Sequence, residues 1–185
     1  NVNTDSTIVI NTEEDLRSIA DNLSGNYILN NNIELTEDWS MVGDSNLAFY
    51  GTFDGNGYTI SNFNMNGNTC AFIHSVAVSG VVKNLNIEAG INAEADAAGI
   101  AINNYGTIDN CTVSGKITSS GSSSIVGGIA ANNYAEINNC HTETFLNGGA
   151  NTGGIVGYLS KGSVKGCWAV GSAVGVKYVG GAVGY

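Results

Sequence analysis

Short apolar runs separated by Gly, Asn and Ser recur along most of the chain, and this pattern predicts many short β-strands joined by turns. One phrase occurs three times with a cysteine at the same place, at Gly99–Val113, Gly128–Thr142 and Gly154–Ala169. Its cysteines are 29 and 27 residues apart. Self-similarity at such a period indicates like units stacked on one another. We therefore predict an all-β fold, a parallel and right-handed β-helix (solenoid) with coils of 26–29 residues.

Aligning the copies on their cysteines predicts which side chains stack from coil to coil. Leu85 fills the cysteine position in an earlier copy, so the predicted column is Leu85, Cys111, Cys140 and Cys167. The residue before it is an asparagine in three copies, Asn84, Asn110 and Asn139. Stacked coils are about 4.8 Å apart. We expect the strand to bend at the asparagine, with each side-chain amide bonded to the amides of adjacent coils.

Residues 1–46 follow a different pattern, which predicts a cap. A β-rich run at Thr7–Ile10 precedes apolar residues at helical spacing between Thr12 and Gly25. Thr12 and Asp15 form a variant of the capping box, and the spacing predicts a helix of about three turns. Short strands are expected at Tyr27–Leu29 and Ile33–Leu35.

The remaining residues, 47–185, are expected to form the repeats. The Asp54–Gly57 run predicts a tight turn rather than a calcium loop, because no acidic residue follows at the twelfth position. The last apolar phrase begins a new repeat and stops. We expect the chain to end mid-coil, as a fragment of a longer protein whose flanking repeats or domains would pack against it.

Charge and composition exclude several classes of partner. The net charge is −10, and residues 1–55 hold ten of the 16 acidic residues against a single arginine. No basic patch is available for phosphates, so nucleic acid is not expected as a partner. No apolar run reaches the roughly 20 residues of a membrane span, so no membrane insertion is expected in this segment.

Four cysteines would allow two disulfides, but their arrangement favours free thiols. Side chains in one column point the same way at about 4.8 Å, whereas a disulfide needs Cβ atoms about 3.8 Å apart. We expect buried, unpaired cysteines. No ligand spacing for zinc is present, so neither a metal nor another cofactor is expected.

The phrases Gly153–Tyr158 and Gly162–Cys167 resemble the GLUG-motif repeat of bacterial surface proteins. The upstream segment Gly51–Ile60 is similar to the one that commonly precedes those repeats. Ala71–Ile73 and Ala98–Ile100 depart from the doubled glycine of the motif. The resemblance covers nearly the whole chain and implies secreted or wall-anchored proteins, including regions beside IgA-specific metallopeptidases. The zinc signature of those peptidases, His-Glu-x-x-His, is absent.

One candidate ligand-binding surface follows from the alignment. His141, Glu143 and Trp168 are predicted on the outward face of adjacent coils, where an exposed indole can stack on a sugar ring. The alternative is that further coils or a neighbouring module cover Trp168. Glu88 and Glu143 are predicted two coils apart, slightly beyond the separation of the carboxyl groups in inverting glycosidases. No lysine aligns beside a paired acid, so no catalytic residue is predicted.

These observations predict a non-catalytic extracellular module of a bacterial surface or secreted protein. Its role would be that of a spacer, or of an adhesin that binds a host glycan or a host surface protein. Two alternatives remain open: a carbohydrate-active β-helix enzyme, and an accessory region of a larger secreted protease.

Overall fold

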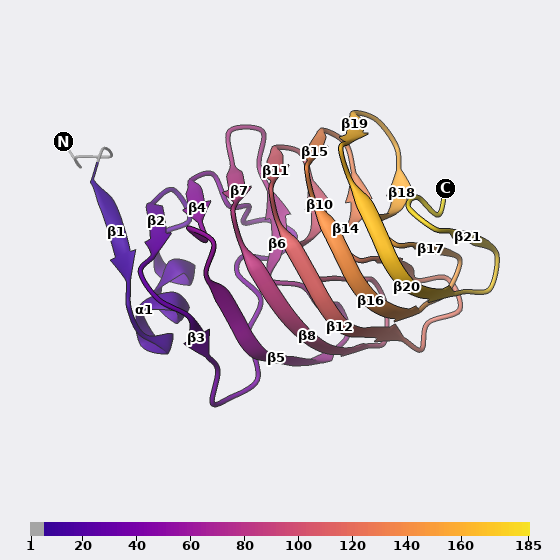
Figure 1. Cartoon of the computed structure of the whole chain (residues 1–185), viewed down its shortest axis with the longest axis horizontal. Coiled ribbons are helices and arrows are strands. Elements are labelled where there is room, and N and C mark those ends of the chain that lie inside the picture. The colour runs from indigo at the N-terminus through magenta and orange to yellow at the C-terminus, as the bar shows by residue number, and fades with distance from the viewer. Residues whose placement is uncertain (1–5) are drawn as a thin grey trace.

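The computed structural model describes residues 6–185, and these form a parallel β-solenoid of about six turns with one short helical segment near the N-terminus. Residues 1–5 of the predicted cap lie outside the described part of the chain. Every strand pairing is parallel, and four sheets run along the solenoid axis (Figure 1). The predicted fold class is confirmed.

From β7 onward, each coil runs through the four sheets in the order A, B, D, C. Sheet A contains β1 (Thr7–Ile10), β2 (Asn26–Leu29), β4 (Thr52–Asp54), β7 (Val81–Lys83), β11 (Thr107–Asp109), β15 (Glu136–Asn138) and β19 (Ser163–Lys165). Sheet B contains β3 (Ile33–Glu34), β5 (Thr59–Gly67), β8 (Asn86–Ala93), β12 (Thr112–Ser119), β16 (His141–Asn147) and β20 (Trp168–Val174). Sheet C contains β6 (Ile73–Val76), β10 (Ala101–Asn104), β14 (Ala130–Asn133) and β18 (Val156–Leu159). Sheet D contains β9 (Ala97–Ala98), β13 (Ile125–Gly127), β17 (Asn151–Gly153) and β21 (Tyr178–Gly180).

The core is built from columns of inward side chains. On sheet B, Val113 pairs with Ile87 and Thr142, and Ile117 pairs with Ile91 and Leu146. All six side chains are buried. The alternating residues of the same strands face outward, as the two-residue period of a strand requires. Because neighbouring coils are in register, a side chain in the core packs mainly on its own equivalents.

The N-terminal helical segment is shorter in its α-helical part than predicted. The α-helix α1 covers Glu13–Arg17, and a 3₁₀ turn, η1, continues it over Ser18–Asp21. The capping box is confirmed: Thr12 accepts from the amide of Asp15, whose carboxylate accepts from the amide of Thr12. The Ser18 hydroxyl donates to the carbonyl oxygen of Asp15. This hydrogen bond uses a backbone acceptor of the helix at the point where the 3₁₀ turn begins. Leu16 and Ile19 are fully buried in the solenoid core.

An aromatic cluster fills the first coils, and the sequence pattern did not predict it. The ring of Phe72 lies 5.3 Å from that of Trp39, 5.1 Å from Phe53 and 6.2 Å from Phe63. The indole of Trp39 donates to the carbonyl of Phe72 at 3.0 Å. All four side chains are buried. They join β4, β5, the start of sheet C and the loop after β3 into one packed unit.

The coil that contains β4, β5 and β6 is one residue shorter than its successors at the corner between sheets D and C. Cys70 pairs with Ala97 and Ile73 with Ala101, so Ala71 and Phe72 face the three residues Ala98–Ile100. The simple alignment of Ala71–Ile73 with Ala98–Ile100 is therefore wrong by one residue. In later coils the extra position is a glycine, at Gly99, Gly128 and Gly154. A Cβ there would approach the Val113, Thr142 or Ala169 side chain to 2.6–2.7 Å, so the corner needs glycine.

The ion pair on α1 predicts a pH-dependent contribution to stability. Partial burial raises the pKa of Glu13, but hydrogen bonds donated by Arg17 and Thr36 outweigh this and lower the pKa from 4.5 to about 2. A carboxyl with a lowered folded-state pKa stabilises the protein above its unfolded pKa, and this contribution is lost as the pH falls toward 2. We expect Glu13→Gln to lower the urea midpoint at neutral pH and to match the wild type near pH 2. Glu14→Gln, on the exposed side of α1, is the control, and equal pH profiles for wild type and Glu13→Gln would contradict the assignment.

Candidate functional site

The candidate site is the outer face of sheet B, the front face in Figure 1, where alternate side chains of five long strands form straight columns. The first column is Thr59, Asn86, Thr112, His141 and Trp168. The second is Glu34, Ser61, Glu88, Ser114, Glu143 and Val170, in which a bulge at Ser61 faces Glu88. The third is Asn64, Gly90, Lys116, Phe145 and Ser172. The structure therefore brings His141, Glu143 and Trp168 together on β16 and β20.

His141 and Trp168 form a stacked aromatic pair. Their ring centroids are 4.4 Å apart and their planes differ by 7°. The Thr112 hydroxyl lies 3.2 Å from Nε2 of His141, so the column continues as a polar contact on the previous strand. Trp168 is 49% exposed in the described chain, and its outer ring face is open. Such a face can stack on a sugar ring, a proline or a cation.

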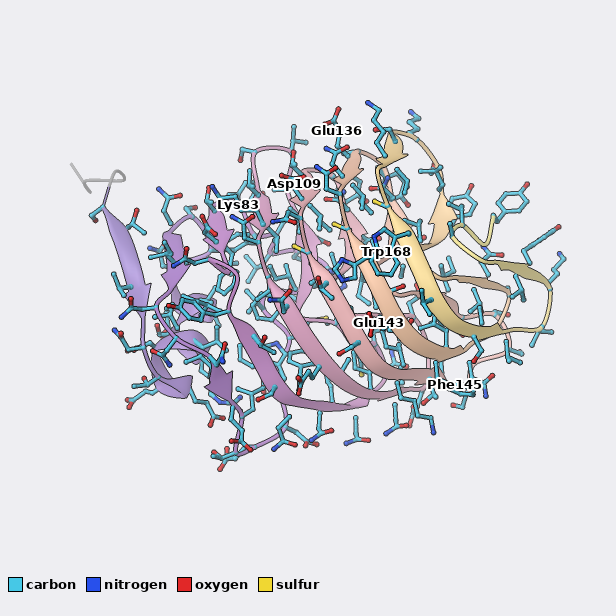
Figure 2. The ribbon with its side chains drawn as sticks, viewed as in Figure 1. Lys83, Asp109, Glu136, Glu143, Phe145 and Trp168 are labelled. Carbon is cyan, nitrogen blue, oxygen red and sulfur yellow. The ribbon has the colours of Figure 1, made fainter. Side chains whose placement is uncertain are left out.

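Phe145 lies on the other side of Glu143 along β16, so two exposed aromatic side chains flank this carboxylate on the outer face of sheet B. Phe145 is 44% exposed, and the Lys116 ammonium lies 5.8 Å from its ring centroid. Figure 2 shows Trp168, Glu143 and Phe145 along one face, on β16 and β20. The floor between the two rings is formed by Glu143 and the exposed Val170. We call the whole strip along the second column, from Glu34 to Val170 with Trp168 and Phe145 beside its last two strands, the sheet B channel.

The predicted cysteine column lies inside the solenoid at the bend between sheets A and B, one residue before each strand of sheet B. Leu85, Cys111 and Cys140 are fully buried and Cys167 is half-buried. All four cysteines, including Cys70, are unpaired. The amide of Cys111 donates to Sγ of Cys140, and the amide of Cys140 donates to Sγ of Cys167. Burial raises the pKa of Cys70 to about 11, and hydrogen bonding to Cys111 together with burial raises that of Cys140. The thiols of Cys70 and Cys140 therefore have little thiolate character, and the cysteine column packs in the core.

The asparagine column marks the bend between sheets A and B. Asn84, Asn110 and Asn139 have φ values of 51–54°, the left-handed conformation that asparagine tolerates. The expected amide ladder runs for one step only, from Nδ2 of Asn110 to Oδ1 of Asn84 at 2.8 Å. Asn84 and Asn139 instead donate to Asp54 and Asp109. Carboxylates on the neighbouring strands are stronger acceptors than an amide, and they interrupt the ladder.

Two features of the surface escaped the sequence alignment. On sheet A, Lys83 lies in register between Asp54 and Asp109, and its ammonium is 3.3 Å from Oδ2 of Asp54 (Figure 2). The expectation that no lysine stands beside a paired acid is therefore wrong. Asp54 precedes the first aligned copy, so the alignment could not place it beside Lys83.

The second feature is Asp96, which lies between β8 of sheet B and β9 of sheet D. Burial raises the pKa of Asp96, although the amide of Ile125 and the side chain of Asn132 donate hydrogen bonds to it.

Among the described residues, no three His, Cys, Asp or Glu side chains are grouped to hold a metal ion. None of the described helices is long and apolar enough to cross a membrane.

The fold and this face together define a parallel β-solenoid with a flat, aromatic-flanked outer sheet. No protein-family model matches the chain. The structure is similar to that of a candidate immunoglobulin A1 protease from Bacteroides ovatus, with a TM-score of 0.84 and 22% sequence identity. The similarity covers 97% of this chain and 61% of that one, and at this identity it shows the fold alone.

A sequence relative is described as a candidate Gly-rich membrane protein of Evansella cellulosilytica. It is 34% identical over 82 residues, which are 40% of this chain and 10% of that protein. The chain thus spans about a tenth of this relative and 61% of the similar structure.

Proposed function

We propose that this chain is a non-catalytic extracellular module of a bacterial surface or secreted protein, and that it binds its ligand through the sheet B channel. The observation that carries the proposal is the open ring face of Trp168, supported from behind by His141 and placed beside Glu143. A large aromatic surface held rigid by stacking loses little conformational entropy on binding. The adjacent carboxylate can accept hydrogen bonds from hydroxyl, amide or ammonium groups.

The resemblance to GLUG-motif repeats supports an extracellular location. The structural similarity to a candidate immunoglobulin A1 protease supports the proposal that the chain belongs to a secreted bacterial protein. We propose that residues 1–46 cap the solenoid, since α1 and η1 bury Leu16 and Ile19 at the N-terminal end of the solenoid. Host glycans and host surface proteins are the ligands proposed for the channel. If the channel has no ligand, the non-catalytic module would serve as a spacer.

The proposal predicts that one aromatic side chain controls binding. In a panel of host glycans and host surface proteins, we expect a saturable ligand whose affinity falls about tenfold in Trp168→Ala, because the stacking platform is lost. Tyr50→Ala is the matched control, since Tyr50 is 54% exposed but lies outside sheet B. Binding that is unchanged in Trp168→Ala for every ligand would refute the channel as the site.

A carbohydrate-active enzyme is the second candidate, and Asp96 is the observation that favours it. A carboxyl whose pKa is raised by burial can act as a general acid. By contrast, hydrogen bonds from Asn84, Asn56 and Lys83 outweigh partial burial and lower the pKa of Asp54. Asp54 therefore stays ionised at neutral pH and is a poor proton donor. Release of sugar products that is abolished in Asp96→Asn would replace the non-catalytic proposal with this one.

A further inference from the structure

The floor of the sheet B channel carries a carboxylate on every second coil. Glu34 pairs with Ser61, Ser114 pairs with Glu88 on one side and Glu143 on the other, and the Ser61 bulge faces Glu88. The column therefore alternates between carboxylate and hydroxyl over five coils. Since adjacent strands are about 4.8 Å apart, the carboxylates repeat at about 9.5 Å along the solenoid axis.

These carboxylates are free to bind a ligand. Glu34, Glu88 and Glu143 are exposed, and no ion pair or hydrogen bond to another described residue engages their side chains. Lys116, the cation of the adjacent column, lies over the Phe145 ring instead. The face beside Glu34 and Glu88 is hollowed. Asn62 and Asn64 also line the hollow, and Gly90 and Gly115 contribute no side chain to it.

The repeat distance discriminates between ligand conformations. A polyproline II segment has three residues per turn and rises 3.1 Å per residue, so equivalent side chains recur every ~9.3 Å. Same-face residues of an extended β-strand recur every ~6.8 Å, which does not fit the column. Polyproline II segments also dock on exposed aromatic rings, as Trp168 and Phe145 provide at one end of the channel.

We propose that the sheet B channel binds a proline-rich protein segment in the polyproline II conformation that carries Lys or Arg at every third position. The cations lie opposite Glu34, Glu88 and Glu143, and prolines pack on Trp168 and Phe145. This inference rests on the proposed function, because it names the partner of the same face. It commits that face to a protein ligand rather than to a glycan.

The test compares synthetic peptides that differ only in the spacing and sign of their charges. We expect repeating Pro-Pro-Lys triplets to bind the full chain more tightly than a peptide of equal length and lysine number whose lysines stand at every second position within flanking prolines, and Pro-Pro-Glu triplets not to bind. Glu88→Gln and Glu143→Gln should each weaken the triplet peptide about two- to fivefold, as expected for exposed ion pairs. Binding should also weaken as salt is raised. Glu136→Gln on sheet A removes one exposed carboxylate elsewhere and should leave affinity unchanged.

The outcomes separate this inference from the proposed function. Equal affinity for the two lysine spacings, or equal effects of Glu88→Gln and Glu136→Gln, would overturn the inference. If the panel then yields a glycan whose binding depends on Trp168, the proposed function stands without it. If neither peptides nor panel ligands show binding that depends on Trp168, both are wrong.

Discussion

Phe72→Ala is expected to destabilise the protein by about 3–5 kcal/mol, because it empties the centre of the aromatic cluster. Phe72 is fully buried against Trp39, Phe53 and Phe63, and its carbonyl accepts the indole hydrogen bond of Trp39. Phe53 and Phe63 are held in β4 and β5 of the same coil, and Trp39 of the preceding coil is hydrogen-bonded to Asn64 and Phe72, so these rings cannot collapse into the space. Urea unfolding followed by circular dichroism measures the loss.

Two further variants serve as controls for this prediction. Phe72→Leu retains most of the volume and should cost clearly less than Phe72→Ala. Phe145→Ala removes the same ring from the exposed face of sheet B and should cost less than about 1 kcal/mol. Equal effects of Phe72→Ala and Phe145→Ala would mean that the cluster does not anchor the first coils.

Gly128→Ala is expected to cost at least about 3 kcal/mol, because the added methyl has no space at the corner between sheets D and C. The new Cβ would overlap the carbonyl oxygen of Gly154 in the next coil and lie 2.7 Å from Cγ2 of Thr142. Both neighbours are held in the parallel ladders, so relief requires the coils to separate. Thermal and urea unfolding of the variant measure the cost.

The same column supplies the control. Gly181 occupies the equivalent corner of the last described coil, and a Cβ there meets nothing within 4 Å. Gly181→Ala should therefore stay within about 0.5 kcal/mol of the wild type. Adding Thr142→Ser to Gly128→Ala should restore part of the loss, since it removes the Cγ2 contact but not the carbonyl overlap. A Gly128→Ala variant as stable as Gly181→Ala would contradict the packing argument.

The cysteine spacing was sufficient to predict the coil, because parallel in-register stacking requires equivalent side chains at equal intervals. It also placed His141, Glu143 and Trp168 on one face, since outward positions alternate with the core positions that define the period. The aromatic cluster could not be predicted in this way. Phe72 lies in the coil of β4–β6, which is one residue shorter than the coils that follow. The alignment was therefore out of register there. The alternating carboxylate column was missed for a related reason, since Glu34 precedes the aligned copies and the bulge at Ser61 shifts the pairing.

The two tryptophans lie at opposite ends of the solenoid and in opposite environments. Trp39 is 4% exposed among the rings of the first coils, whereas Trp168 is 49% exposed on the last strand of sheet B. Their fluorescence therefore differs in colour, with a blue-shifted emission from the buried indole and a red-shifted emission from the solvated one. Coils in such a stack contact only their neighbours, so the two ends can lose structure separately. Because Trp168 is already solvated, a red shift of the emission along an unfolding series reports the opening of the end that holds Trp39.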